Sequence, residues 1–251
     1  MSIIRGGVEG VVAILPGNVA RTACRPILVQ AEDGHDYWCK VVENPMSDRV
    51  PTNELIAAGI GEKLGVAMPK TRIMDVTELI GWEFVEGRFI RNRWAFGSRN
   101  VIGGTPTHDL KHEQRDGNSK RYVGFYALYD LLVGGDPQWL INVTDDHGYL
   151  SFDHGHFFPG GPDWSTRSLR PALQTEAHRL NQPPGNLDLD EVNRVGTAIE
   201  SLSRADIDEV VSRVPPEWPV SDPELAALAG FIDARRETVT ARLRERLGLD
   251  N

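Results

Sequence analysis

The order of the apolar segments constrains the fold of this chain more than any other feature. Runs of strand length fill much of residues 9–45, a helical period covers 52–64, and two further strand-like runs reach residue 85. From residue 188 onward the apolar spacing is helical. We therefore expect an α+β fold with a small β-rich N-terminal lobe that contains one helix, and a mainly helical C-terminal lobe, separated by a cleft. The boundary is expected between residues 86 and 87.

The individual elements follow from local patterns. Asp33-Gly34 lies between two apolar runs and predicts a hairpin. In the first helix, Thr52 or Asn53 is expected to cap the start and Gly65 to end it. Residues 92–116 show no period, so we expect a long, partly irregular excursion there. Further elements are predicted as strands over 11–15, 27–31, 37–42, 71–76, 79–85, 140–143 and 149–152, and as helices over 122–133, 203–214 and 222–247.

Composition excludes several classes of protein. The 251 residues are 40% hydrophobic and carry a formal net charge of −9, so neither nucleic acid nor an anionic membrane surface is an expected partner. No stretch has the length and apolar character of a membrane span or a signal peptide. Cys24 and Cys39 stand in no metal-binding spacing and are expected to be free thiols. These features predict a cytoplasmic protein.

A set of oxygen-bearing side chains follows the apolar helix over 122–133. Asp136 and Asn142 precede the segment Phe152-Asp153-His154-Gly155, in which an Asp-x-Gly turn ends a predicted strand. Carboxylate and amide oxygens are ligands that Mg²⁺ accepts, and phosphoryl transfer also needs a group that orients the attacking hydroxyl. Asp153 and Asn142 are therefore candidate metal ligands, and Asp136 is the candidate catalytic carboxylate. Singly, each also fits a turn or a solvent-facing strand position.

Lys40 and Glu54 form a second candidate pair. Lys40 lies within an apolar strand, where an ammonium group needs a partner or a ligand. Glu54 lies near the start of the next helix, and kinase folds use such a glutamate to hold the lysine that contacts ATP phosphates. The alternatives are a surface lysine on an edge strand and a glutamate that favours a helix N-terminus.

No Walker motif or G-x-G-x-x-G loop is present. The segment from Gly17 to Arg25 is the candidate loop over the phosphates, with Arg25 able to neutralise phosphate charge. Glu86, which closes the β-rich section, is a further candidate for nucleotide binding. The histidines at 147, 154 and 156 have no cysteine or glutamate at metal-ligand spacing, and His154 is expected to fill the middle of the Asp-x-Gly turn.

The chain resembles the HipA-like kinases, within the wider protein-kinase-like and phosphoinositide-kinase-like fold. The resemblance rests on RPILVQAEDGHDYWCKVV, NELIAAGIGEKLGVAMP, GDPQWLIN, YLSFDHGHFF and VPPEWP. It implies that Lys40 pairs with Glu54, that Asp136 is the catalytic-loop aspartate, that Asn142 is a metal ligand and that Asp153 is the main Mg²⁺ ligand. Two departures stand out: Pro137 follows Asp136 where the family usually has Arg or His, and Asn142 lies one residue further from Asp136 than is usual.

We therefore expect an ATP- and Mg²⁺-dependent kinase that transfers the γ-phosphoryl group to a hydroxyl, with Ser or Thr of a protein as the implied acceptor. Three alternatives remain open. One is a lipid or small-molecule kinase of the same fold, and another is a pseudokinase that binds a nucleotide or a partner without phosphoryl transfer. The third is a non-kinase structural protein, which would bind no nucleotide.

Overall fold

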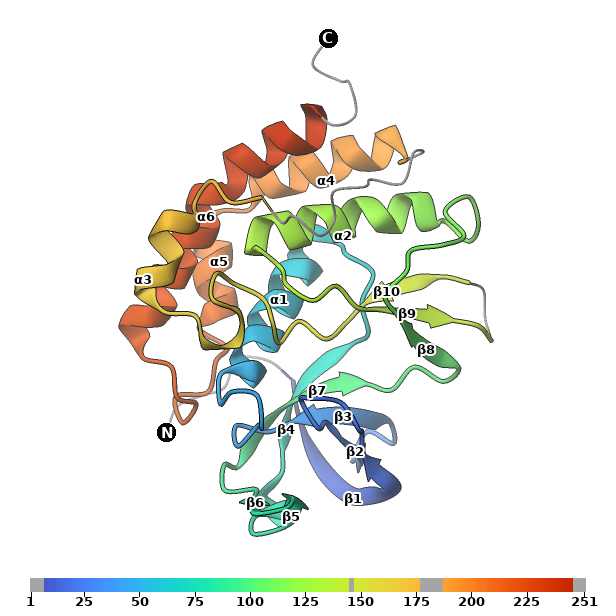
Figure 1. Cartoon of the computed structure of the whole chain (residues 1–251), viewed down its shortest axis with the longest axis vertical. Coiled ribbons are helices and arrows are strands. Elements are labelled where there is room, and N and C mark those ends of the chain that lie inside the picture. The colour runs from blue at the N-terminus through green and yellow to red at the C-terminus, as the bar shows by residue number, and fades with distance from the viewer. Residues whose placement is uncertain (1–6, 145–146, 177–186, 246–251) are drawn as a thin grey trace.

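The computed structural model describes residues 7–144, 147–176 and 187–245. Its main sheet is a closed barrel in the order β1-β2-β3-β7-β4. Neighbouring strands are antiparallel, except that β1 and β4 run parallel. In Figure 1 the barrel occupies the lower half of the view and the helices lie above it. The barrel strands are β1 (Val8–Val19), β2 (Ile27–Ala31), β3 (Asp36–Lys40), β4 (Thr71–Asp75) and β7 (Trp94–Arg99).

The β2–β3 hairpin shows how the sequence builds the barrel. Ile27, Val29 and Ala31 are buried in its interior, while the residues between them are more exposed, as the alternation of side chains along a strand requires. Gly34 takes a positive φ of 78° in the turn, a conformation that glycine adopts without steric cost. The antiparallel pairing of β2 with β3 confirms the hairpin predicted at Asp33-Gly34.

The expectation of a long, partly irregular excursion over residues 92–116 is wrong for the part up to residue 107, whereas residues 108–116 form neither a helix nor a strand. This segment contains β7, which pairs with both β3 and β4, and β8 (Gly104–Thr107). The barrel thus takes one strand from beyond residue 86. Ala95, Phe96 and Gly97 are consecutive and all buried, so β7 lacks the alternation of polar and apolar residues by which a half-buried strand is recognised.

Two smaller sheets accompany the barrel. A three-stranded sheet in the order β10-β9-β8 lies beside the helices in Figure 1 and is built from β8, β9 (Trp139–Asn142) and β10 (Tyr149–Ser151). A two-stranded hairpin of β5 (Glu83–Val85) and β6 (Arg88–Phe89) lies at the bottom of the same view. The strand expected over 79–85 is therefore shorter than predicted and lies outside the barrel.

The helices enclose the larger of two hydrophobic cores, and the barrel interior forms the smaller one. Among the described helices, none has the length and apolar character needed to cross a bilayer. Their bounds are α1 (Val50–Leu64), α2 (Asn118–Leu132), α3 (Thr166–Leu169), α4 (Leu189–Ser201), α5 (Arg204–Val211) and α6 (Asp222–Glu245).

Helix α1 lies between the barrel and the remaining helices (Figure 1) and is buried at most of its positions. It begins at Val50, with Pro51 in the first turn, where proline is favoured. Neither Thr52 nor Asn53 caps its start, which corrects that expectation, whereas Gly65 ends it in a left-handed conformation as predicted. Gly59 permits a close approach to α5, because a Cβ there would lie 2.6 Å from Cγ1 of Val210.

Candidate active site

The centre of the site is a buried ion-pair cluster. Lys40 stands at the end of β3, and its Nζ contacts Oε1 of Glu54 on α1 and lies 2.5 Å from Oδ1 of Asp153. Lys40 is 7% exposed and Glu54 2% exposed. Because β3 lies between β2 and β7 in the closed barrel, Lys40 is not on an edge strand. The structure thus brings together three of the side chains singled out in the sequence.

The electrostatics of the cluster favour the charged forms of Lys40 and Glu54. Burial acts to lower the pKa of Lys40, but the charges of Asp153 and Glu54 outweigh it and raise that pKa. Burial acts to raise the pKa of Glu54, but the charge of Lys40 and a hydrogen bond with His154 lower it to about 2. Burial is also the main reason why the pKa of the nearby Cys24 thiol is raised to about 12. At neutral pH, the Glu54 carboxylate therefore faces the Lys40 ammonium group.

The Asp-x-Gly turn is held in place by contacts with α1. Asp153 follows β10 with a positive φ of 59°. His154 is buried, with Nε2 2.8 Å from Oγ of Ser151 and Nδ1 3.5 Å from Oε2 of Glu54. Asn53 Nδ2 donates to the carbonyl oxygen of Gly155 at 2.9 Å. His154 thus fills the middle of the turn, and Asn53 and Glu54 on one helix fix the turn that carries Asp153.

Asp136 lies in the short loop between α2 and β9. The loop backbone is joined to the Asp-x-Gly segment by a hydrogen bond from the N–H of Gly135 to the carbonyl oxygen of His156, at 3.3 Å. Gln138 Nε2 donates to Oδ2 of Asp136 at 3.1 Å. Asp136 makes no ion pair with Lys40 among the described residues; its connection to the cluster runs through Gln138, which lines the same cavity as Lys40 and Asp153.

The structure does not bring Asn142 to this cluster. In the register of the hairpin, Trp139 pairs with Ser151, just before Asp153, whereas Asn142 is three residues further along β9. At about 3.3 Å per residue, this places Asn142 roughly 10 Å from the end that carries Asp153. Its Oδ1 accepts hydrogen bonds from the backbone N–H and the hydroxyl of Thr144, at 3.2 and 3.0 Å. Asn142 therefore serves the turn at the opposite end of the hairpin.

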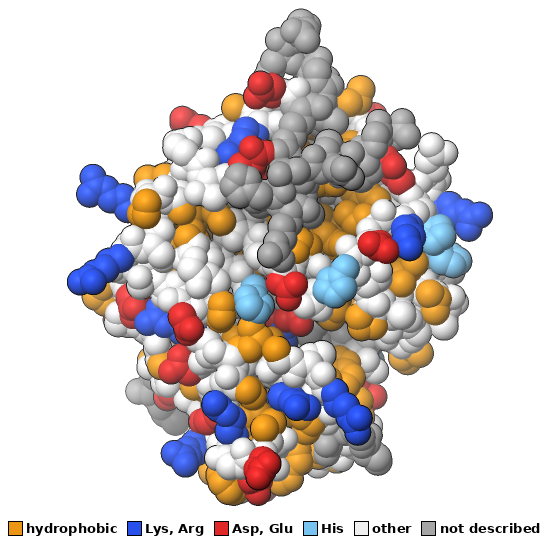
Figure 2. Space-filling view, viewed as in Figure 1, with side chains coloured by type: hydrophobic (Ala, Val, Ile, Leu, Met, Phe, Trp, Pro, Cys, Tyr) orange, Lys and Arg blue, Asp and Glu red, His pale blue; other side chains and the backbone are white. Residues whose placement is uncertain are grey.

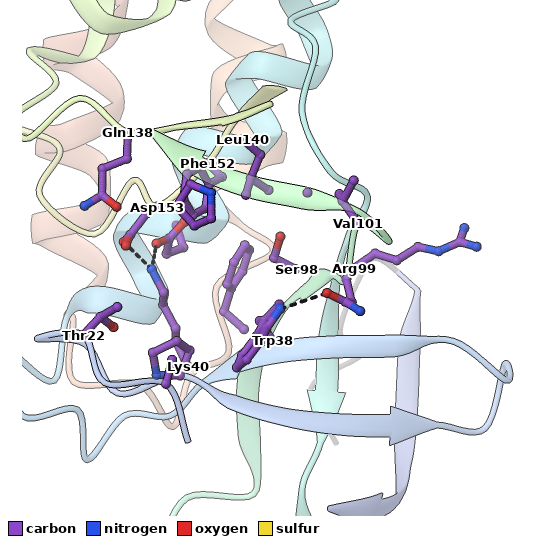
Figure 3. A pocket seen from close by; sticks show the side chains of 17 residues that line it. Thr22, Trp38, Lys40, Ser98, Arg99, Val101, Gln138, Leu140, Phe152 and Asp153 are labelled. Atoms are coloured by element: carbon purple, nitrogen blue, oxygen red, sulfur yellow. Dashed lines mark hydrogen bonds and ion pairs between the residues drawn. The ribbon is translucent and has the colours of Figure 1, made fainter. Parts of the chain in front are cut away.

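A cavity of about 260 Å³ opens beside Lys40, Glu54 and Asp153, between the barrel and the three-stranded sheet (Figure 3). Its far end is formed by Trp38 and by the chain that follows β7. Trp38 Nε1 donates to Oδ1 of Asn100 at 3.1 Å, which holds the indole in place. The apolar side chains that line the cavity are those of Ala20, Pro26, Trp38, Phe96, Val101, Pro106, Leu140 and Phe152.

Three other candidates lie in the β-rich part of the chain. Gly17 lies within β1, Arg25 lies in the β1–β2 connection, and Glu86 is exposed between β5 and β6. Arg25 and Glu86 are not among the described residues that line the cavity. The β1–β2 connection itself does cover the cavity, through residues 20, 22 and 26.

Sequence reasoning missed Trp38, Asn100 and Gln138. Asn100 directly follows β7, so the unrecognised strand also hid this edge of the cavity. Gln138 directly precedes β9, a position that the sequence shows once the strand is placed. Trp38, two residues before Lys40 on the same strand, had a signal in its spacing, because alternate residues of a strand share one face.

Comparisons with known proteins show which solved structures this fold is similar to. No family model matches the sequence, and no curated protein is similar to it. Among solved structures, the proinflammatory kinase CtkA of Helicobacter pylori is similar over 96% of this chain and 98% of that one, with a TM-score of 0.56 and 12% identity. This match confirms the α+β, protein-kinase-like fold that the resemblance to HipA-like kinases implies.

Two weaker similarities concern other kinase-related structures. The Golgi casein kinase with Mn and ADP bound gives a TM-score of 0.46 at 11% identity, over 98% of this chain and 74% of that one. A chain of the HipA, HipB and operator DNA complex of the Shewanella oneidensis toxin–antitoxin system gives 0.31 at 11% identity, over 85% and 58%. We build nothing on these two similarities.

Proposed function

We propose that this protein is a kinase that transfers the γ-phosphoryl group of ATP to a hydroxyl. The observation that carries the proposal is the Lys40–Glu54–Asp153 cluster at one end of a largely apolar cavity. A base fits the apolar end, where the indole of Trp38 offers a flat surface, and the phosphates then extend toward Lys40. In this proposal the β-rich N-terminal part binds the nucleotide and the helical part supplies the catalytic loop, as in a two-lobed kinase.

The cluster also suits a divalent cation. Asp153 uses Oδ1 for Lys40, and no hydrogen bond from a described residue reaches its Oδ2. No group of three or more His, Cys, Asp or Glu side chains in the described ranges forms a metal cluster, which agrees with Mg²⁺ sites that combine one or two carboxylates with phosphate oxygens and water. On the face shown in Figure 2, acidic side chains and two histidines lie near the middle, and further acidic and basic side chains are spread over the rest of that face. When bound, Mg²⁺ would offset the negative charge of the triphosphate.

The chain's own residues then have separate roles. Lys40, held by Glu54, contacts the phosphates, and Asp153 holds the metal. Asp136 orients the acceptor hydroxyl and takes its proton while the hydroxyl oxygen bonds to the γ-phosphorus. The bond from that phosphorus to the β–γ bridging oxygen breaks, and ADP leaves. We propose Ser or Thr of a protein as the acceptor, and a lipid or small-molecule hydroxyl as the alternative that an acceptor screen with labelled ATP would reveal.

One observation favours a second candidate, a pseudokinase. Asp136 is followed by Pro137, so this loop places no cationic side chain directly after the catalytic carboxylate. A protein of this kind would bind nucleotide in the same cavity and release no ADP.

The decisive experiment measures ADP release and phosphoryl transfer by the full chain and its Asp153→Asn variant. The substitution keeps the shape of the side chain and removes the charge, so we expect turnover to vanish while the circular dichroism spectrum stays unchanged. Asp190→Asn, on the exposed start of α4, is the matched control and should leave turnover intact. Unchanged turnover in Asp153→Asn would refute the metal assignment, and absence of turnover in the parent chain with retained nucleotide binding would favour the pseudokinase.

A further inference from the structure

The loop between Asp136 and β9 consists of only Pro137 and Gln138. We propose that Gln138, in this short loop, supplies the second oxygen ligand for the divalent cation beside Asp153, and that Asn142 does not. The inference deepens the proposed function and rests on it.

The orientation of the Gln138 amide is fixed by its neighbour. Its Nε2 donates to Oδ2 of Asp136 at 3.1 Å, and a carboxylate can only accept such a bond. The nitrogen must therefore face Asp136, which leaves the amide oxygen Oε1 for another partner. No described residue donates to Oε1. Figure 3 shows Gln138 extending toward Asp153, with its oxygen on the side of that carboxylate.

The backbone of Gln138 is also held. Its N–H donates to the hydroxyl of Tyr129 at 3.4 Å, and Tyr129 is fully buried in α2. Pro137 restricts the preceding backbone, because its ring fixes φ. The amide thus starts from an anchored position at the edge of the cavity that Lys40 and Asp153 also line.

The chemistry of the two candidate amides is the same, so position decides between them. An amide carbonyl is a suitable ligand for Mg²⁺ or Mn²⁺. The oxygen of Asn142 accepts two hydrogen bonds from Thr144 at the opposite end of the hairpin. Gln138 lines the same cavity as Asp153 and directly precedes the Trp139 that pairs with Ser151, and the extra methylene of glutamine lengthens its reach from a loop that is short. A cation held there would also fix the amide that positions Asp136, and so would couple metal binding to the placement of the acceptor hydroxyl.

The test is Mn²⁺ binding by the full chain in the presence of a non-hydrolysable ATP analogue, followed by electron paramagnetic resonance of free Mn²⁺. We expect Gln138→Ala to weaken Mn²⁺ binding by about tenfold or more, in the range seen when groups around a metal are lost. Gln138→Glu retains a ligand oxygen and should bind Mn²⁺ more tightly than Gln138→Ala. Asn142→Ala is the matched control and should bind Mn²⁺ as the parent does.

The outcomes separate this inference from the proposed function. If Asp153→Asn abolishes Mn²⁺ binding while Gln138→Ala matches the parent, the assignment of Gln138 is wrong and the proposed function stands. If Asn142→Ala weakens binding and Gln138→Ala does not, the ligand assignment is likewise overturned. If Asp153→Asn binds Mn²⁺ as the parent does, the metal site of the proposed function itself fails. Circular dichroism on each variant, together with recovery of binding in Gln138→Glu, distinguishes loss of a ligand from loss of the fold.

Discussion

The buried cluster makes a quantitative prediction about stability that is independent of catalysis. Replacing Lys40 by Met removes the one ammonium that faces Glu54 and Asp153. Glu54 and Asp153 would then lose their shared ammonium partner in a buried site, and breaking a buried ion pair in this way costs about 3–5 kcal/mol. Glu54→Gln leaves Lys40 paired with Asp153 and keeps a hydrogen-bonding group, so we expect a smaller loss of about 1–2 kcal/mol.

The double variant Lys40→Met/Glu54→Gln removes both members of the pair. Of the three ionisable members of the cluster, only Asp153 is then left, and its side chain is 14% exposed at the cavity. We expect the double variant to be destabilised by less than the sum of the single variants, with a coupling of about 2 kcal/mol, within the range measured for contacting residues.

Urea unfolding of the four proteins at pH 7 gives the required free energies from the midpoints and slopes. The slopes should agree among the variants, because the exposed surface changes little. Additivity to within about 0.5 kcal/mol, the value typical of independent sites, would refute the account of Lys40 and Glu54 as a coupled buried pair.

Two further predictions concern acid stability and the packing of α1. The pKa of Glu54 is lowered from 4.5 to about 2 in the folded chain, so its contribution to stability is present above pH 4.5 and is lost as the pH falls toward 2. Urea midpoints measured across this range should therefore fall less steeply for Glu54→Gln than for the parent. Parallel curves for the two proteins would contradict the assignment of the lowered pKa to Glu54. Gly59→Ala adds a Cβ 2.6 Å from Cγ1 of Val210. We expect the overpacking cost of about 1–3 kcal/mol to exceed the gain in helix propensity of about 1 kcal/mol. Adding Val210→Ala removes the clashing methyl group and should restore stability in the double variant. Thermal unfolding would show this, and a melting temperature that rises in Gly59→Ala alone would speak against the close contact.

The cluster could be located from sequence because each member carried a local signal. Lys40 was a charge within an apolar strand, Glu54 opened the next amphipathic segment, and Asp153 preceded a glycine in a turn. Their contacts in the structure join segments that are far apart along the chain. The catalytic and binding roles of these residues remain predictions.

The remainder of the site depended on information that no local pattern contains. Which of Gln138 and Asn142 lies beside Asp153 is decided by the register of β9 against β10, and register is a relation between two segments. Glu86 was assigned to the nucleotide site because it follows an apparent last strand. The last strand of the barrel along the chain is instead β7, which pairs with β3 and β4. The residue that follows β7 is Asn100, and it lies at the edge of the cavity.

The placement of α1 has a consequence for how the cavity can open. The helix is anchored to the helical part at both ends, through Arg49 to Glu224 at 2.6 Å and through Lys63 to Glu209 at 2.7 Å. Its Glu54, however, forms an ion pair with Lys40 of the barrel. A swing of the whole barrel away from α1 would have to pull this ammonium out of its carboxylates while both are shielded from water. In the proposed function, lifting of the β1–β2 connection, which lines the cavity through residues 20, 22 and 26, would admit a nucleotide without breaking this ion pair.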